Sequence, residues 1–380
     1  MIALLVLFAL AVALFLHPYV TYPLSLRFVR WLQGAMPLAM SGPKPTSYAI
    51  VCCAYNERKD IQQKIENLLA AQARLPNCKI FVHSDGSTDG TNEILRSYQD
   101  RITVSIAEAR GGKSAGMNRL LSMTDAEIVI FTDANVMIDI DRIPRVGEYF
   151  QDPAVGCATG RLVYINKASS QTAMIGTMYR GFEENIKRLE TDTGTIVYTD
   201  GTLFAIRRTL FKPVPADITD DFHTALTILC AGYRNVGADN LIAYEQAASV
   251  QRDEVRRRIR IGCRVFNCHR LFWPKLRHLN ALTLYKYVSH KLIRWFSGYI
   301  LLTAAVIGAV IAAMALGQLG LLLYAIALVG CYFAATTFAI PIMSPLCEAV
   351  IHTMATAYGV LLSLRGERFQ TWTVASSSRK

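Results

Sequence analysis

Hydrophobic residues follow two patterns along this chain. The two ends carry long apolar runs, whereas in the middle short apolar runs alternate with amphipathic stretches. Short apolar runs separated by helical stretches predict strands that pair in parallel through right-handed crossovers. We therefore expect an α/β domain that lies between membrane segments.

The middle of the chain predicts a regular alternation of strands and helices. The predicted strands cover residues 48–54, 79–83, 102–106, 127–132, 155–164 and 195–207. The predicted helices cover residues 60–72, 89–98, 113–122, 169–191 and 221–232, the last of which is closed by Gly232. These elements place the α/β domain at residues 46–250.

An apolar segment opens the chain. Residues 2–16 are almost purely apolar, and residues 20–24 extend the run toward the roughly 20 residues that span a bilayer. A cleaved signal peptide is the alternative, but its positively charged first region is missing here. We therefore predict an uncleaved anchor, and Arg27 and Arg30 place the chain that follows it on the cytoplasmic side.

Interfacial helices are predicted on both sides of the domain. Residues 24–40 suit a helix that lies in the membrane interface with Trp31 at headgroup level, which completes an N-terminal unit of residues 1–45. Residues 251–297 are basic, aromatic and helix-like, and form a second interfacial unit.

Three apolar segments occupy the C-terminal unit, residues 298–380. Residues 298–316 and 319–340 are long enough to span, whereas 346–364 carries Glu348 near its start and either spans or lies in the interface. The basic tail favours the cytoplasm, but three crossings would place it outside. The sequence therefore leaves the number of C-terminal spans at two or three.

Composition narrows the partners. Hydrophobic residues make up 52% of the chain, and the formal net charge is +11. Positive charge beside apolar helices favours anionic lipid headgroups or phosphorylated substrates, and no nucleic-acid recognition motif is present. The nine cysteines have no framework spacing, and Cys263 with Cys268 and His269 lacks the second pair that a zinc site needs.

A carboxylate ends one of the most apolar predicted strands. Asp133 follows the run 127–132, and Asn135 adds an oxygen two residues later. Ligands of open α/β sheets bind at the carboxyl ends of strands, so this edge suits a hard cation and a phosphate. Asp85 ends another strand, and Gly111-Gly112-Lys113 enters a helix N-terminus that suits an anion.

Four motifs in order resemble those of a known family. They are Ala54-Tyr55-Asn56-Glu57, Asp85-Gly86-Ser87-Thr88-Asp89-Gly90-Thr91, Gly112-Lys113 with Asn118, and Asp133-Ala134-Asn135. Their order and spacing are similar to those of membrane-bound family-2 glycosyltransferases, the group of cellulose, chitin and hyaluronan synthases and many bacterial exopolysaccharide enzymes. The resemblance covers roughly residues 46–295. It implies a GT-A fold with a Rossmann-like mixed sheet, and donor binding by Tyr55, Glu57, Asp85, Lys113 and Asp133.

Two further motifs extend the resemblance. Ile218-Thr219-Asp220-Asp221 is similar to the family's Thr-Glu-Asp motif, which makes Asp221 the general base for the acceptor hydroxyl; helix capping is the alternative. The run of arginines at 256–260 stands where the family has Gln-x-x-Arg-Trp. It implies that Arg260, with Arg257 or Arg258, binds the diphosphate; a basic face on lipid headgroups is the alternative.

The chain departs from the family's pattern at two positions. Asn135 replaces the second carboxylate of Asp-x-Asp, so Asp133 and Asn135 would hold Mg²⁺ or Mn²⁺ together with diphosphate oxygens. Ile261 replaces the Trp, which puts long-chain processive synthesis in doubt.

Two other polar groups are interpreted by position. The loop Asp200-Gly201-Thr202 resembles the family's acceptor-side loop, whereas Glu183-Glu184 are interpreted as a solvated helix face.

The expected function is an inverting transfer of a sugar from a nucleotide diphosphate donor, of the uridine series, to a growing glycan or a lipid-linked acceptor. The alternatives are transfer to a polyprenyl phosphate and a catalytically inactive partner of a polysaccharide synthase. We expect a multi-pass protein of the inner membrane with its domain in the cytoplasm. Because so few spans form a thin channel, secretion of a polymer would require an oligomer or a partner protein.

Overall fold

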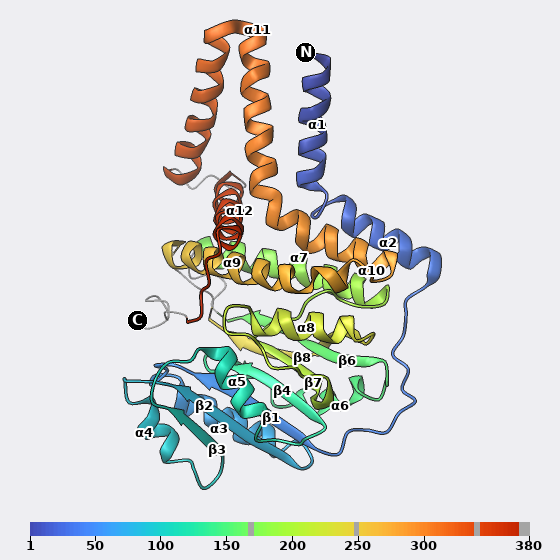
Figure 1. Ribbon diagram of the computed structural model, residues 1–380, viewed down its shortest axis with the longest axis vertical. Helices are drawn as coiled ribbons and strands as arrows, with labels where there is room; N and C mark the ends of the chain where they lie inside the picture. The colour runs from blue at the N-terminus through green and yellow to red at the C-terminus, as the bar shows by residue number, and fades with distance from the viewer. Residues whose placement is uncertain (166–170, 247–250, 338–342, 372–380) are drawn as a thin grey trace.

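The computed structural model describes residues 1–165, 171–246, 251–337 and 343–371. An α/β domain occupies one end of the elongated molecule, and a layer of helices separates it from α1 (Ile2–Leu16) and α11 (Ile293–Thr337) at the other end (Figure 1). The predicted domain boundary at residue 250 and the ends of the predicted segments 169–191 and 319–340 lie outside the described residues.

The domain is built on one mixed sheet of eight strands in the order β3-β2-β1-β4-β7-β6-β8-β5. Its first half is parallel and consists of β1 (Tyr48–Ala54), β2 (Cys78–Asp85), β3 (Thr103–Ala107) and β4 (Ile128–Asp133). Its second half consists of β5 (Met137–Ile138), β6 (Val155–Tyr164), β7 (Leu203–Arg207) and β8 (Arg234–Glu245). Because β7 runs antiparallel to both β4 and β6, the predicted Rossmann-like mixed sheet is confirmed.

Helices cover both faces of the sheet, which explains the continuous apolar strands. Alternate residues of β1 enter two separate cores: Ile50 packs with Ile65 of α3 (Ile61–Gln72), and Val51 shares a core with Met117 of α5 (Lys113–Leu121). A strand that is buried on both faces has no polar alternation. The other helices of the domain are α4 (Thr91–Arg96), α6 (Val146–Tyr149), α7 (Gln171–Asp192) and α8 (Asp220–Cys230).

One predicted strand is wrong in its extent, and one long strand was not predicted. The predicted strand 195–207 is reduced to β7, because the polar groups of residues 195–198 bond to side chains and to β8 instead of forming a ladder. The sequence reading also missed β8 after α8. Gly232 has φ 86° just after that helix, as its predicted closing role requires.

A layer of helices separates the domain from the apolar helices. It contains α2 (Thr21–Gln33), α9 (Gln251–Leu276), α10 (Ala281–Tyr287) and a short π-helical turn, η3 (Val288–Leu292). Helix α2 bends by 62° from α1, so residues 21–24, which extend the apolar run in the sequence, lie in α2 and not in α1. The predicted N-terminal interfacial helix therefore begins earlier than residue 24.

Helix α11 forms a hairpin. Its backbone breaks from helical geometry at Gly317 (φ 60°, ψ −141°), and the two limbs on either side correspond to two of the predicted apolar segments (Figure 1). By length and composition, two of the described helices could cross a membrane, or three if α1 and α2 count as one bent span.

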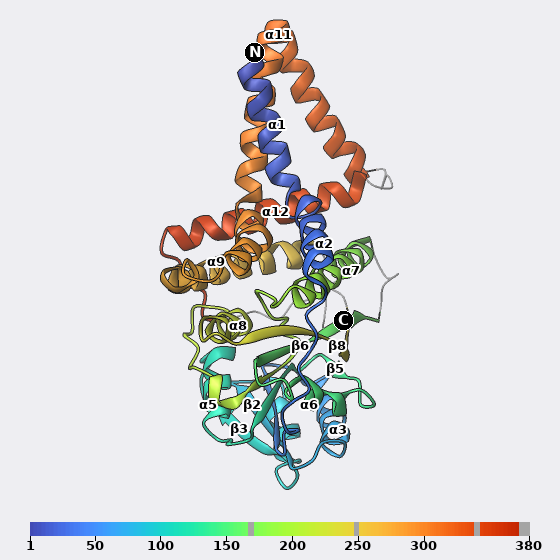
Figure 2. The same cartoon turned by 90° about the vertical axis from the view of Figure 1, so that its right-hand side faces the viewer.

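The last helix, α12 (Met343–Leu364), runs across the directions of α1 and α11 (Figure 2). It packs on α9 at a glycine crossing, where a Cβ on Gly359 would lie 2.3 Å from the carbonyl oxygen of Ile259. The chain then returns to the domain, where Arg368 pairs with Asp217 at 3.5 Å. Residues 365–371 therefore lie on the same side of the apolar helices as the α/β domain.

Candidate functional site

Three elements meet at Lys113, the first residue of α5. Its Nζ atom lies 2.7 Å from Oδ1 of Asp133 at the end of β4 and 3.1 Å from Oδ2 of Asp220 at the start of α8. Burial opposes the charge on Lys113, but the two carboxylates outweigh it and hold its pKa well above the ordinary value. The structure thus brings together three segments that are far apart in the sequence.

Asp85 organises the loop in front of Lys113. Its carboxylate is fully buried and accepts the backbone N–H groups of Gly111 at 2.7 Å and of Gly112 at 3.0 Å. Asp85 therefore accepts two of the backbone N–H groups that precede α5. Gly112 has φ 86°, which favours glycine and lets the loop turn back onto Asp85.

The loop after β1 lies at the same edge of the sheet. The Arg110 guanidinium stacks on the ring of Tyr55 at 3.6 Å, and the backbone N–H of Glu57 donates to Thr91 Oγ1 at 2.9 Å. Asn56, which has φ 55°, accepts the N–H of Thr88 with its side chain at 2.8 Å. The predicted donor-side residues Tyr55 and Glu57 are thereby fixed beside the Asp85 loop.

Asp221 is a partly exposed carboxylate at the start of α8. Burial and the neighbouring Asp220 raise its pKa to about 7. Its backbone carbonyl accepts Thr199 Oγ1 at 3.0 Å, and a Cβ on Gly201 would lie 2.8 Å from its Oδ2 atom. A carboxylate poised near neutral pH suits a general base, and the predicted acceptor-side loop does lie against it.

The two other residues of that loop have structural partners. Asp200 pairs with Arg180 of α7 and accepts the hydroxyl of Thr202 at 2.9 Å. Although burial opposes its charge, Arg180 and Lys187 lower the pKa of Asp200 to about 2. Asp200 and Thr202 therefore shape the loop, whereas Gly201 forms its contact with Asp221.

The predicted arginines divide into two groups. Arg257 and Arg258 both donate to Glu254 on their own helix, at 2.7 and 2.8 Å, a partner that the sequence reading missed. Burial and the nearby Arg264 lower the pKa of Arg260 to about 10. Arg264, also missed, is buried and donates to the carbonyl of Ile218 before α8. Arg260 and Arg264 are thus like charges that an anion would stabilise.

A further carboxylate, Glu245, lies beside the residues predicted to hold a cation. Asn135 donates its amide N–H to Glu245 Oε1 at 2.9 Å, and burial together with Asp133 raises the pKa of Glu245 to about 7. Within the described ranges, no group of three His, Cys, Asp or Glu side chains is placed to hold a metal ion. The oxygens of Asp133, Asn135 and Glu245 fit Mg²⁺ or Mn²⁺ only if a substrate completes the shell.

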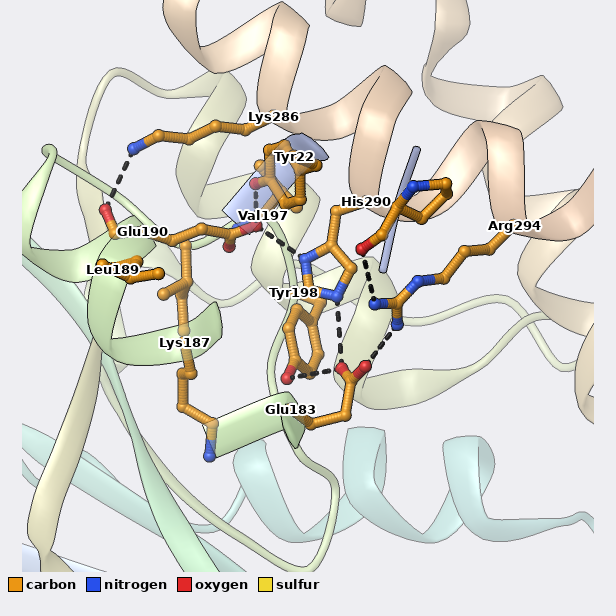
Figure 3. Close-up of polar contacts among 12 residues, drawn as sticks. Tyr22, Glu183, Lys187, Leu189, Glu190, Val197, Tyr198, Lys286, His290 and Arg294 are labelled. Atoms are coloured by element: carbon orange, nitrogen blue, oxygen red, sulfur yellow. Dashed lines mark hydrogen bonds and ion pairs between the residues drawn. The ribbon is translucent and has the colours of Figure 1, made fainter. Parts of the chain in front are cut away.

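The prediction for Glu183 and Glu184 is wrong. Only 7% and 9% of their surfaces are exposed. Residues of η3 and α11 cover Glu183 (Figure 3), whereas Glu184 lies beside Lys187, which donates to a backbone carbonyl of β6. Glu184 pairs with the buried Lys187 at 2.7 Å, and Glu183 pairs with Arg294 and His290. The helical period of α7 indicated a polar face, but it could not show that other parts of the chain pack against that face.

The C-terminal tail reaches the same site. A Cβ on Gly112 would lie 2.6 Å from the backbone carbonyl of Gln370. The carbonyl of Glu367 accepts the Asn267 amide at 3.2 Å, which fixes the tail along α9. Residues 365–371 therefore run from the end of α12 to the N-terminus of α5.

Part of the chain is similar to known proteins. Residues 49–214 match the family described as Glycosyl transferase family 2. The beta-monoglucosyldiacylglycerol synthase of Synechocystis sp. is 29% identical over 160 residues, which are 39% of this chain and 33% of that protein. An N-acetylglucosaminyltransferase of Rhizobium leguminosarum bv. viciae is 23% identical over 220 residues, 53% of this chain and 51% of that one. The chain thus spans about a third to a half of these curated relatives.

A solved structure extends the likeness beyond the sheet. The mannosyltransferase PcManGT from Pyrobaculum calidifontis, in complex with GDP-Man and Mn²⁺, superposes with a TM-score of 0.70 at 23% identity. The match covers 95% of this chain and 100% of that one, so the apolar helices are included. Residues 49–214 are therefore similar to glycosyltransferase family 2, and the fold is the GT-A fold with a Rossmann-like mixed sheet.

Proposed function

We propose that the chain is a membrane glycosyltransferase that moves a sugar, with inversion, from a nucleotide diphosphate donor of the uridine series to a lipid-linked acceptor or a growing glycan. The observation that carries the proposal is the partly exposed carboxylate of Asp221, with a pKa of about 7, next to the Lys113–Asp133–Asp220 cluster. A single base without a covalent nucleophile suits direct displacement, which inverts the anomeric centre.

The protein's own groups then have defined tasks. Asp221 accepts the proton of the acceptor hydroxyl while Gly201 leaves room for that carboxylate. Lys113, Arg260 and Arg264 place positive charge where the diphosphate would lie. A divalent cation held by Asp133, Asn135 and Glu245 would neutralise charge on the departing nucleotide diphosphate.

The layer of helices above the site supports an acceptor at the membrane surface. Helices α9, α10 and α12 lie between the sheet and the apolar hairpin of α11 (Figure 1). Nucleotide sugars are cytosolic, so the domain would face the cytoplasm of a multi-pass inner-membrane protein. The intact contacts of Lys113 favour an active enzyme over an inactive partner.

The test is nucleoside diphosphate release by the purified protein in detergent, with UDP- and GDP-sugars, Mn²⁺ or Mg²⁺, and three acceptors. Diacylglycerol, a polyprenyl phosphate and an oligosaccharide are supplied separately, and the labelled product is extracted. We expect release from one UDP-sugar, stimulated most by a lipid acceptor. Stimulation by the oligosaccharide would assign the protein to glycan extension, and no release from any donor would favour the inactive partner.

Transfer should depend on pH through Asp221. Asp221 can accept a proton only when its carboxylate is deprotonated. We therefore expect kcat/KM to rise as the pH increases through about 7, the pKa of Asp221, and to level off above it. Because the charge of Asp220 raises this pKa, Asp220→Asn should move the acidic limb to lower pH. A pH–rate profile of both proteins checks the shift, and an unmoved limb in the variant would contradict the assignment.

A further inference from the structure

A buried polar cluster lies between α7 and four helical segments, α2, α10, η3 and α11, which we call the membrane-side helices (Figure 3). We name it the α7 cluster; its members are Tyr22, Glu183, Glu190, Tyr198, Lys286, His290 and Arg294. They come from α2, α7, the loop before β7, α10, η3 and α11. None of them belongs to the chemistry proposed above, so their burial needs another explanation.

Glu183 joins three elements through one carboxylate. Its Oε2 atom accepts the hydroxyl of Tyr198 at 3.2 Å and lies 3.2 Å from Nε2 of His290, while its Oε1 atom accepts Arg294. Burial opposes the charge of Glu183, but Arg294 and His290 hold its pKa well below the ordinary value. Glu183 therefore binds the loop before β7 and the start of α11 at once.

Glu190, two turns further along α7, repeats the arrangement. Its carboxylate accepts the hydroxyl of Tyr22 at 2.5 Å and the backbone N–H of Val197 at 3.2 Å, and lies 2.6 Å from His290 Nδ1. Both nitrogens of His290 thus face carboxylates of α7. The anchor-side helix α2 and the loop before β7 are thereby held by one side chain.

Lys286 fixes the backbone of the same loop. Its buried ammonium donates to the carbonyls of Glu190, Thr193 and Thr195, at 2.9, 3.1 and 3.1 Å. The loop thus takes contacts from Lys286 of α10 at residues 193 and 195, and from Glu190 and Glu183 of α7 at residues 197 and 198.

The same loop then continues directly into the site. Thr199 donates its hydroxyl to the backbone carbonyl of Asp221 at 3.0 Å, and Gly201 packs on the Asp221 carboxylate.

We infer that Glu183 and Glu190 are positioning residues that couple the seating of the membrane-side helices on the domain to the placement of the acceptor-side loop against Asp221. The inference rests on the proposed function for its effect on turnover. Its structural part, the ordering of residues 195–200, does not depend on turnover. A buried ionic cluster contributes little net stability by itself. Any arrangement that separates its partners leaves an unpaired buried charge, which is costly, so the cluster favours the one arrangement in which all partners meet.

Two variants test the inference, one that removes a buried charge and one that removes a single hydroxyl group. Glu183→Gln removes the charge that Arg294 and His290 pair with, and Tyr198→Phe removes only the hydroxyl that links the loop to Glu183. The matched control is Asp192→Asn, because Asp192 is also a carboxylate of α7 that pairs with α2, through Arg30 at 3.1 Å. Tyr198→Phe keeps the test decisive if Glu183→Gln does not fold.

The readouts are kcat, the affinity for nucleoside diphosphate, and hydrogen exchange of residues 195–200 in the full-length protein. We expect kcat to fall about 10-fold in Tyr198→Phe and about 100-fold in Glu183→Gln, with unchanged nucleotide affinity and faster exchange. Unchanged kcat and exchange in both variants would overturn the inference, as would an equal loss in Asp192→Asn. If the wild type transfers no sugar, the proposed function fails, but hydrogen exchange of residues 195–200 still tests whether Glu183 orders the acceptor-side loop. The two proposals can therefore fail separately.

Discussion

Asp221→Asn is expected to reduce sugar transfer by about 10²- to 10⁴-fold, the usual contribution of a positioned general base. Asparagine keeps the size of the side chain and can still accept the N–H of Phe222, which Asp221 Oδ1 accepts at 2.7 Å. It cannot take a proton from an acceptor hydroxyl. The variant should therefore lose kcat while its affinity for nucleoside diphosphate stays near that of the wild type.

The control for this variant is Asp239→Asn, which neutralises a half-exposed carboxylate paired with Arg188 on the surface. It should leave both transfer and nucleotide affinity unchanged. Product formation is measured in initial rates at pH 8, where the Asp221 carboxylate is charged in most molecules. Turnover within a few-fold of the wild type in Asp221→Asn would remove Asp221 from the mechanism.

The parallel half of the sheet could be predicted because its strands are buried on both faces. The residues of β1 alternate between two cores, so every position is apolar, and the predicted range 48–54 matches the strand. The second half depends on contacts between distant segments. The predicted strand 195–207 was too long because Glu190 and Lys286 hold its first part as a loop, and neither partner lies in that segment.

The site likewise contains residues that the sequence could predict and residues that depend on contacts between distant segments. Asp85, Lys113 and Asp133 stand at the ends of predicted elements, so topology brings them to one edge. Glu245 could not be found this way, because it contacts Asn135 across 110 residues and lies on the strand that was missed. Arg264 was equally hidden, since an arginine in a basic helix does not reveal whether it faces lipid or a buried carbonyl.

Hydropathy also could not orient α12. Residues 346–364 are long and apolar enough to cross a membrane, yet the helix lies across α1 and α11 and packs on α9 (Figure 2). The informative residues are Gly262 and Gly359, which let the two helices approach closely. Glycines of this kind are recognised only when both helices are placed.

Asp133→Asn is expected to weaken Mn²⁺ binding in the presence of UDP and to lower kcat/KM by about 10²-fold or more, as the loss of one strong electrostatic contact does. Asp133 is the carboxylate among the predicted ligands that lies on the strand end, and it also holds Lys113. Mn²⁺ binding is followed by electron paramagnetic resonance, which does not require turnover. Mn²⁺ bound as tightly as in the wild type would restrict Asp133 to positioning Lys113.

Glu245→Gln and Asn135→Asp separate the two neighbours of Asp133. If Glu245 supplies the carboxylate that the family has at position 135, Glu245→Gln should weaken Mn²⁺ binding by about 10- to 100-fold, and Asn135→Asp in that background should restore it. If Glu245 only orients Asn135, the single variant should change Mn²⁺ affinity little. The double variant decides between these roles. If a carboxylate at either position can bind Mn²⁺, the carboxylate introduced by Asn135→Asp replaces the lost carboxylate of Glu245 and restores binding. If Glu245 only orients Asn135 through the hydrogen bond between them, the double variant restores nothing.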